Sequence, residues 1–275
     1  MRRIMTALSA ALLAVSVMAQ SASDVSVMSF NIRGENENDG TNSWSFRYVS
    51  VTMMFQETTP DLICLQEATD LQLEYYVDVL SKYKRIGVGR DNGKKEGEYT
   101  SFLYNSKELS AGKSGTFWLS ETPDKASSGW GADHPCNAVW AIFKEMKSGK
   151  SFLAVNTHID VDDPEYRKQA IDFILQKIDA LNSDNLPVVL TGGFNMEDGD
   201  PGLEAVKARF QNARGAAFST DDVRSYHNYG KVSQTIDHIY FGGFSSCQEF
   251  KTITARYNDR AYVSDHNPIQ AILIL

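Results

Sequence analysis

Six short motifs in this chain place a polar side chain directly after an apolar stretch. They are Asn31-Ile32-Arg33, Leu65-Gln66-Glu67, Asn156-Thr157-His158, Gly193-Phe194-Asn195, Ile236-Asp237-His238 and Ser264-Asp265-His266. Carboxyl, imidazole and amide groups are those with which proteins hold cations and transfer protons. Because strand ends in layered α/β folds converge on a crevice, these side chains are candidates for one shared site.

Each motif on its own also has a purely structural explanation. Asn31 could cap a turn, Glu67 could cap the helix that follows it, and Asp265 could cap a loop. A single His158 or His266 is more often a buried structural residue than a catalyst. Six such motifs in this order are not expected from independent turns, so the sequence favours a common site.

Alternating strands and helices would position these motifs. Residues 164–181 form the clearest helix, because Ile171, Ile174 and Ile178 lie on one stripe and Pro164 fits the first turn. Further helices are predicted at 45–57 and 69–81, and strands at 25–30, 61–66, 84–88, 99–105, 113–119, 137–146, 151–156, 188–191, 236–241, 250–254 and 269–274. This order predicts an α/β (α+β) fold with two mixed sheets and helices outside.

The N-terminal segment is expected to lie outside the fold. Two arginines precede an apolar stretch that ends at Met18, and small residues follow at the positions that a signal peptidase reads. We predict a signal peptide over residues 1–19, cleaved after Ala19 with Ala22 as the alternative, and one domain over 20–275. No second long apolar stretch is present, so a secreted or periplasmic protein without a transmembrane segment is expected.

The mature chain is acidic and has few cysteines. The sequence has 27 basic and 35 acidic residues, and removing the two signal-peptide arginines leaves 25 against 35, a net charge of −10. Such a surface disfavours duplex DNA, although a bound divalent cation can reverse the sign locally. Cys64 is expected in the core, and Cys136 and Cys247 could form a disulfide, which the sequence leaves open. No Cys/His spacing suggests zinc.

Taken together, the motifs resemble the endonuclease/exonuclease/phosphatase superfamily, which has the fold of deoxyribonuclease I. The resemblance covers the mature chain and rests on Leu-Gln-Glu, Asn-Thr-His and Ser-Asp-His in this order. Secreted bacterial members are the most similar, on the motifs Trp44 with Arg47, Gly89-Arg90, Ser101 to Tyr104 and Phe117 to Pro123. The resemblance implies a four-layer α-β-β-α sandwich and phosphoester hydrolysis with a divalent metal, Mg²⁺ or Mn²⁺.

The resemblance also implies a metal site and an acid–histidine pair. Glu67 matches the principal metal carboxylate, Asp265 the second acidic ligand, and Asn31 an assisting group at the metal or phosphate. His266 matches the histidine at the scissile phosphate, and Asp237 the acid that orients and charges it.

Further roles follow from the same resemblance. His158 matches a second histidine that contacts the phosphate, and Asn195 an amide donor to the phosphate or the attacking water. Arg47 and Arg90 are candidate substrate-phosphate contacts, with surface ion pairs as the alternative. His238 follows Asp237 along a strand, so it is expected to point to the opposite face and to be structural.

Gly193 departs from the family pattern, which has Asp between the preceding Gly and the aromatic or aliphatic residue. That Asp handles a proton on the attacking water or the leaving group, and such help contributes about 10²–10⁴-fold in rate. The chain could be a weakened enzyme in which His266 with Asp237, or His158, takes over the proton transfer. It could instead be a dead enzyme that still binds metal or phosphate, or an active protein that has lost its Asp. Acids in neighbouring loops could compensate, although a turn-forming or solvated role is favoured for them: Asp160, Glu197, Asp198 and Asp200.

The sequence therefore predicts a divalent-metal-dependent phosphoesterase, monomeric, with Gly193 weakening its turnover. Its expected substrate is a small phosphoester, a phospholipid head group or nucleic acid, duplex DNA being disfavoured by charge. The alternative is a catalytically dead family member that binds a phosphate ligand. Trp118 and Trp130 lie in a long excursion, where they either stack on a substrate or simply pack the loop.

Overall fold

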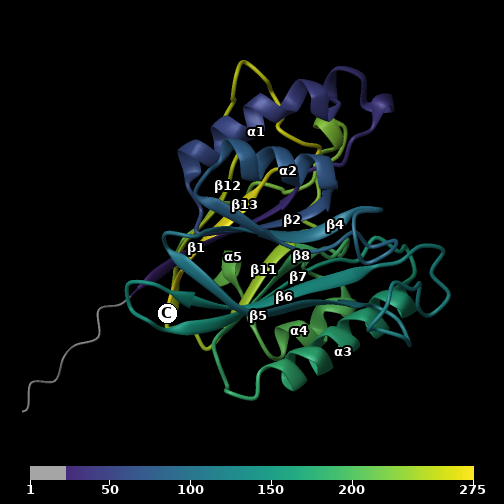
Figure 1. The fold of residues 1–275 in the computed structure, drawn as a ribbon, viewed down its shortest axis with the longest axis vertical. Coiled ribbons are helices and arrows are strands. Elements are labelled where there is room, and N and C mark those ends of the chain that lie inside the picture. The colour runs from purple at the N-terminus through teal and green to yellow at the C-terminus, as the bar shows by residue number, and fades with distance from the viewer. Residues whose placement is uncertain (1–22) are drawn as a thin grey trace, which may run out of the picture.

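Two β-sheets are stacked face to face, with helices on both outer faces (Figure 1). The computed structural model describes residues 23–275, so the predicted signal peptide and both cleavage positions lie outside the described residues. The predicted sandwich of two mixed sheets between helices is confirmed. Within residues 23–275, none of the helices combines the length and the apolar character that membrane crossing requires.

The first sheet has seven strands in the order β10-β12-β13-β1-β2-β4-β3. Their bounds are β1 Asp24–Asn31, β2 Leu62–Ala68, β3 Tyr83–Ile86, β4 Tyr99–Asn105, β10 Ala217–Ser219, β12 Ser246–Thr252 and β13 Ile269–Ile274. Helices α1 (Trp44–Thr58) and α2 (Asp70–Val79) cover its outer face, where Phe55 and Tyr76 pack against Phe30 and Leu65.

The second sheet has six strands in the order β5-β6-β7-β8-β11-β9. Their bounds are β5 Leu109–Trp118, β6 Asn137–Glu145, β7 Ser151–His158, β8 Val188–Gly193, β9 Gln211–Asn212 and β11 Asp237–Gly242. Helices α3 (Pro164–Leu181) and α4 (Glu204–Lys207) lie on its outer side. The remaining short elements are α5 (Ala213–Ala216) and the 3₁₀ turns Glu37–Asn42, Pro201–Leu203 and Asn228–Gly230.

Local sequence explains where the long helices begin. Asp163 accepts a hydrogen bond from the Glu165 amide, and Pro164 occupies the first turn of α3. At α2, the Thr69 side chain accepts from the Gln72 amide while the Gln72 side chain accepts from the Thr69 amide. This reciprocal capping satisfies two amides that the helix itself cannot.

The predicted element positions are largely confirmed. Residues 164–181 and 269–274 have the predicted bounds, but β5 and β12 each begin four residues earlier than predicted. Buried and exposed residues do not alternate regularly in the first part of β5, because its pairing with β6 is interrupted between Ala111 and Ser114. The elements α4, α5, β9 and β10 were not predicted, because each is too short for a hydrophobic period to be visible.

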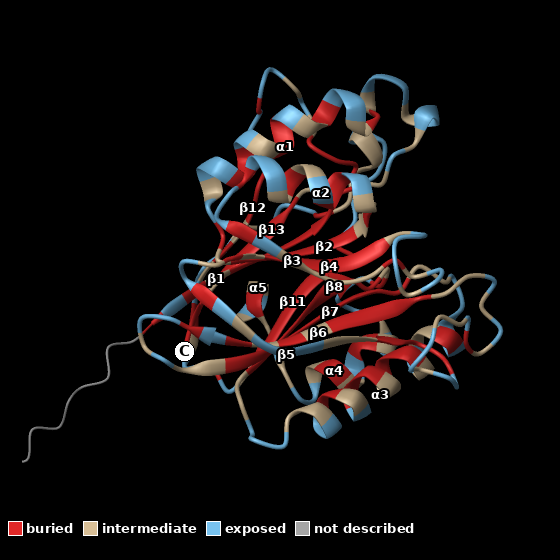
Figure 2. Ribbon diagram, viewed as in Figure 1, coloured by how far each residue is buried: buried red, intermediate tan, exposed pale blue. Residues whose placement is uncertain are grey.

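A buried polar network joins the two sheets across an otherwise apolar interface. Gln66 donates to Asn156 Oδ1 at 2.7 Å, and Thr191 donates to the same oxygen at 3.2 Å. Asn156 in turn donates to the Leu65 carbonyl at 2.8 Å. Figure 2 shows the strands as the main buried part of the molecule. Because each polar group needs its partner in an apolar interface, the network fixes how β2 sits over β7 and β8.

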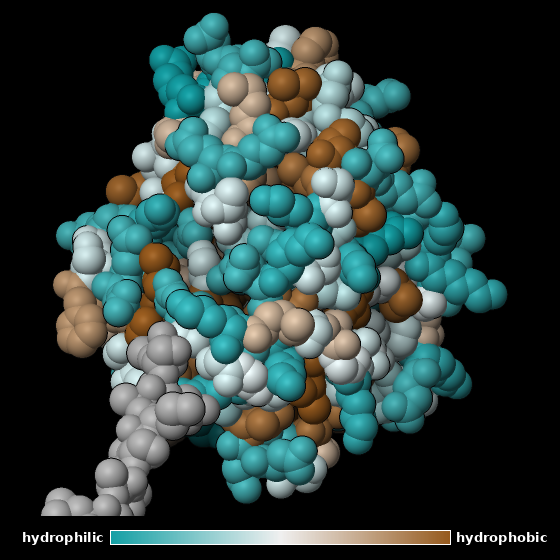
Figure 3. Space-filling view, turned by 60° about the vertical axis from the view of Figure 1, so that its left-hand side comes forward, coloured by the Kyte–Doolittle hydropathy of each residue, from teal (hydrophilic) through white to brown (hydrophobic). Residues whose placement is uncertain are grey.

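The visible surface is mostly hydrophilic. In Figure 3 the apolar side chains form small separate patches among polar ones, as expected for an acidic chain without a broad apolar face.

Candidate active site

A crevice of about 430 Å³ is lined by side chains from both sheets. The lining includes Asn31, Arg33, Glu67, His158, Asp160, Asn195, Tyr226, Asp265 and His266. A larger cavity of about 700 Å³ lies along α3 and Pro201–Leu203, and it shares only Arg167 with the crevice. Size alone therefore does not identify the site, whereas the convergence of acids, histidines and amides does.

Three residues of the crevice have left-handed backbone conformations. The φ angles are 60° at Arg33, 56° at Glu67 and 54° at Asn195. At Glu67 the pairing of β2 with β4 shifts between Leu65 and Ala68, which marks a bulge. A bulge redirects a side chain, and left-handed residues other than glycine cost of order 1–3 kcal/mol each. The fold thus maintains local strain where these side chains enter the crevice.

The predicted metal group is assembled at the ends of β1 and β2. Asn31 Nδ2 donates to Glu67 Oε1 at 2.8 Å, and the Arg33 guanidinium lies 3.7 Å from Glu67 Oε2 and 3.9 Å from Asp265 Oδ2. Burial, reinforced by the like charge of Glu67, raises the pKa of Asp265. Carboxylate oxygens are the hard donors that Mg²⁺ and Mn²⁺ prefer, so Glu67 and Asp265 fit such an ion. Asn31 holds Glu67 through its amide nitrogen and accepts from the Arg33 amide at 3.0 Å.

Asp237 and His266 form a buried acid–histidine pair. His266 Nδ1 lies 2.7 Å from Asp237 Oδ2, and both side chains are almost fully buried. Burial opposes the charge on the imidazole, but the attraction of Asp237 outweighs it and raises the pKa of His266 to about 9. His266 therefore carries a proton at neutral pH, when it can donate to an anion.

Gly193 lies between His158 and Asp237 on three adjacent strands. In the register of the sheet His158 of β7 pairs with Gly193 of β8, and Gly193 pairs with Asp237 of β11. Residues directly opposite one another point to the same face. A Cβ at Gly193 would lie 2.9 Å from His158 Cδ2, 3.3 Å from His158 Nε2 and 3.5 Å from Asp237 Oδ1. An acid here would face both side chains after a small shift of the His158 ring.

One carboxylate oxygen of Asp237 faces position 193. Asp237 Oδ1 is buried and, among the described residues, has no hydrogen-bond partner. Its other oxygen is taken by His266. A buried polar atom without a partner is costly, and this one points toward the position that a side chain at 193 would occupy.

His158 and Asn195 complete the crevice. Asn195 Nδ2 donates to the Ile159 carbonyl at 3.0 Å and lies 3.5 Å from His158 Nε2, which is itself 3.9 Å from Glu67 Oε1. His238 is buried on the other face of β11, where its Nε2 lies 2.8 Å from the Met196 carbonyl oxygen. The structure thus places His238 away from the crevice, as its strand position predicts.

Arg47 does not contact the crevice, so the prediction of a substrate contact is wrong. Its side chain is fully buried. It donates to the carbonyls of Asn42 at 2.6 Å, Ile32 at 2.9 Å, Val263 at 2.7 Å and Arg33 at 2.9 Å. Arg47 therefore holds together the chain segments that carry the metal group, and its charge is not available to a ligand.

Arg90 forms the ion pairs that the alternative prediction described. Its Nη1 lies 2.7 Å from Asp160 Oδ2 and 3.1 Å from Glu98 Oε2. Asp160 lines the crevice, and Arg90 lines a small adjoining hollow together with Glu67 and His158. Its Nη1 is engaged by both carboxylates, so Arg90 positions Asp160.

Several site residues were missed by sequence reasoning. Arg33 belongs to the motif Asn31-Ile32-Arg33, and its place two residues after Asn31 is the signal from which its presence in the site could be predicted. Tyr226 packs on His266 with ring centroids 4.6 Å apart. Ser225 accepts from the Asp237 amide at 3.2 Å and Ser264 donates to Asp265 at 3.0 Å. A lone serine or tyrosine in a loop gives no such signal in a sequence.

The two tryptophans of the excursion pack the protein itself. Trp118 Nε1 donates to the Arg90 carbonyl at 2.7 Å. Trp130 packs edge-on against Tyr166 and Phe173 at 5.7 Å each. All three cysteines are free and buried, so Cys136 and Cys247 do not form a disulfide.

The protein thus combines two stacked mixed sheets with a carboxylate pair and an acid–histidine pair near one crevice. A family model described as the Endonuclease/Exonuclease/phosphatase family matches residues 28–266, and the chain belongs to this family. Phosphoester hydrolysis is the type of activity that its members have.

Solved structures and a viral sequence are similar over most of the chain. An endonuclease/exonuclease/phosphatase from Bacteroides vulgatus is 32% identical, with a TM-score of 0.86 and 91% of this chain and 98% of that chain covered. A mannosyl-6-phosphatase from Bacteroides thetaiotaomicron is 29% identical, with a TM-score of 0.86 and coverage of 91% and 100%. An uncharacterized protein, L388, of Acanthamoeba polyphaga mimivirus is 25% identical over 256 residues, covering 83% of this chain and 91% of the relative.

Proposed function

We propose that this protein is a divalent-metal-dependent phosphoesterase for small phosphate esters, with turnover limited by Gly193. The observation that carries the proposal is the convergence of Glu67, Asp265, His158 and His266 on one crevice. A sugar phosphate is the first substrate to test, because a relative with 29% identity is a mannosyl-6-phosphatase. We further propose that the protein is a monomer. We also propose that residues 1–19 direct its export, which N-terminal sequencing of the exported protein would test.

The residues divide the work between charge and proton transfer. Glu67, held by Asn31, and Asp265 would bind Mg²⁺ or Mn²⁺, which as a Lewis acid supplies charge stabilisation to the phosphoryl group. His266, kept protonated by Asp237 at 2.7 Å, donates to a phosphate oxygen. His158 and Asn195 offer further polar contacts on the other side of the crevice. This arrangement binds and polarises a phosphate ester without a cationic surface.

Gly193 removes the group best placed to accept a proton from the attacking water. The neighbouring His266 has a pKa raised to about 9 by Asp237 despite its burial, so it is a poor base at neutral pH. His158 is then the remaining imidazole in the crevice. General-base help is worth about 10²–10⁴-fold, so we expect slow hydrolysis in the native chain.

The test compares the native chain with Gly193→Asp and with Gly193→Asn as the matched control. Hydrolysis of p-nitrophenyl phosphate, bis-p-nitrophenyl phosphate and mannose 6-phosphate is measured with Mg²⁺ or Mn²⁺. We expect Gly193→Asp to raise kcat at least about tenfold, within the range of general acid–base help. Gly193→Asn has the same size without a titratable group and is expected to give no gain. Glu67→Gln should abolish turnover in either background.

Two outcomes would contradict parts of the proposal. Equal turnover in the native chain and Gly193→Asp would mean that another residue moves the proton and that Gly193 is not limiting. If both chains are inert on all three substrates, the enzyme proposal fails. The alternative is a non-catalytic phosphate-binding protein, which the absence of an acid at position 193 favours. Calorimetry would then have to show that the native chain binds phosphate and that Glu67→Gln does not.

A further inference from the structure

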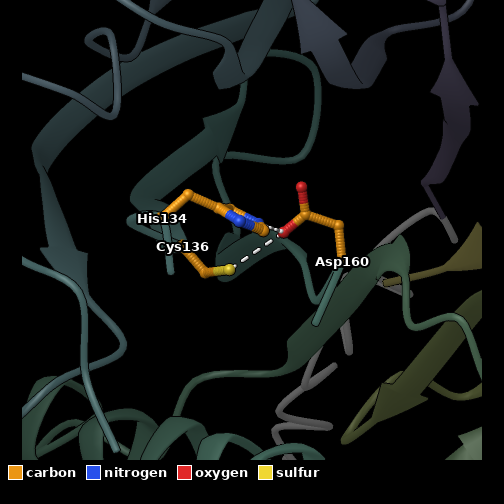
Figure 4. Close-up of side chains that lie close together, drawn as sticks. All are labelled: His134, Cys136 and Asp160. Carbon is orange, nitrogen blue, oxygen red and sulfur yellow. Dashed lines mark hydrogen bonds and ion pairs between the residues drawn. The ribbon is translucent and has the colours of Figure 1, made fainter. Parts of the chain in front are cut away.

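Two side chains of different chemistry, an imidazole and a thiol, converge on one carboxylate oxygen of Asp160 beside the crevice (Figure 4). His134 Nε2 lies 2.8 Å and Cys136 Sγ lies 3.0 Å from Asp160 Oδ1. One ligand atom from each residue lies within 4.8 Å of the other two. His134 and Cys136 come from the end of the excursion before β6, whereas Asp160 follows β7. Two separate segments of the chain thus meet at this point.

We propose that His134, Cys136 and Asp160 bind a thiophilic divalent cation, with Zn²⁺ as the best match. Imidazole nitrogen, thiolate and carboxylate oxygen are the ligands that Zn²⁺ takes in tetrahedral sites, and three protein ligands leave a fourth position for water. Ligand atoms about 2.0–2.3 Å from such an ion are about 3.3–3.7 Å apart in a tetrahedron. From their hydrogen-bonded positions, the ligand atoms of the three side chains need to separate by roughly 0.5–1 Å.

Neighbouring groups prepare His134 and Asp160 for this role. Asp133 Oδ1 lies 2.5 Å from His134 Nδ1, so the ring turns its Nε2 toward Asp160. A carboxylate on the far nitrogen is the arrangement that orients metal-binding histidines. Arg90 engages only Asp160 Oδ2, at 2.7 Å, which leaves Oδ1 for the cation.

The local charge favours a doubly positive ion despite the nearby arginine. Asp133 and Glu98 add two carboxylates beside the cluster, and Arg90 is the cation paired with Asp160 and Glu98. Binding replaces the thiol proton of Cys136 and any proton on His134, and both are released to solvent. Affinity should therefore rise with pH. Cys136 is 1% exposed, so the thiolate formed would be shielded from oxidants.

This site is distinct from the carboxylate pair of the proposed phosphoesterase. Glu67 and Asp265 offer only oxygen, whereas Cys136 adds a sulfur ligand that gives the site its own spectroscopic signature. The sequence suggested no zinc site because His134 and Cys136 are only two residues apart and Asp160 follows much later in the chain. Only the fold brings them together.

The test is a titration of the metal-stripped full chain with Co²⁺ followed by absorption. We expect a thiolate-to-cobalt band that saturates at one sulfur-bound cobalt per chain. The band should be lost in Cys136→Ser and kept in Cys247→Ser, a matched change at a buried cysteine on β12. It should also be kept in Glu67→Gln, which separates this site from the crevice. His134→Ala should weaken cobalt binding at least about tenfold.

Absence of the band with cobalt in excess would overturn the proposal, as would a band that survives Cys136→Ser. Circular dichroism shows whether Cys136→Ser folds. If it does not fold, X-ray absorption of the zinc-loaded native chain decides. One sulfur at about 2.3 Å supports the site, and a shell of nitrogen and oxygen alone refutes it.

Discussion

Replacing Asp237 with Asn should change how the stability of this protein depends on pH. Asp237 accepts from His266 Nδ1 at 2.7 Å inside the protein, and its attraction outweighs burial and raises the pKa of His266 from 6.5 to about 9. The raised pKa means that the folded state binds a proton more tightly than the unfolded chain. Stability from this proton is fully present below pH 6.5 and is lost as the pH rises through 9.

The magnitude follows from the two pKa values of His266. A shift from 6.5 to about 9 corresponds to roughly 3 kcal/mol at pH 5–6, and linkage reduces this to below roughly 1 kcal/mol at pH 9. In Asp237→Asn the burial of His266 remains but its partner acid does not, so the pKa of His266 should fall well below 9, with only Asp265 and Glu67 still raising it. The variant should therefore lose most stability in acid and little in base.

Chemical denaturation of both chains at pH 6 and pH 9.5 measures this difference. We expect the difference in unfolding free energy between the native chain and Asp237→Asn to be roughly 2–3 kcal/mol smaller at pH 9.5 than at pH 6. NMR titration of the His266 ring gives the pKa directly. A gap that is the same at both pH values, or a native His266 that titrates near 6.5, would refute the reasoning.

Two further predictions concern residues first considered for substrate binding. Arg47→Met leaves four carbonyl oxygens without their donor, so it should lower the unfolding free energy by about 3–5 kcal/mol. A loss below about 1 kcal/mol in denaturant titration would show that Arg47 is not structural. Trp130→Ala removes contacts with Tyr166 and Phe173 and should cost roughly 2–4 kcal/mol, with KM for p-nitrophenyl phosphate unchanged. A raised KM at full stability would instead place Trp130 on the substrate.

Long periodic elements were predictable from the sequence, and short or irregular ones were not. The helix over 164–181 carries its own stripe and cap, so its bounds follow from local chemistry. Strand β9 has two residues and pairs with β11 only because the fold places them together. The start of β5 was not predicted either, because its first residues are defined by pairing with β6 and not by a regular hydrophobic pattern.

For the site, too, the sequence predicted some features and not others. The motifs predicted which residues meet in the crevice, because strand ends converge there. They did not distinguish Arg47, which is buried among carbonyls, from an arginine that faces a ligand. The direction of a long side chain depends on neighbours distant in sequence, such as Val263, and no local pattern records them.

The pairing of β1 with β13 has a consequence for how the chain reaches this structure. β1 lies between β2 and β13, and the Leu275 amide donates to the Ser23 carbonyl at 2.8 Å. During N-to-C synthesis one edge of β1 stays open until the last strand is made, which favours slow folding and exposes that edge to aggregation. Because the two ends of the folded part are adjacent, a short linker could join them. The chain could then be opened in a surface loop, so that β13 directly precedes β1 and the late, long-range pairing becomes a local one.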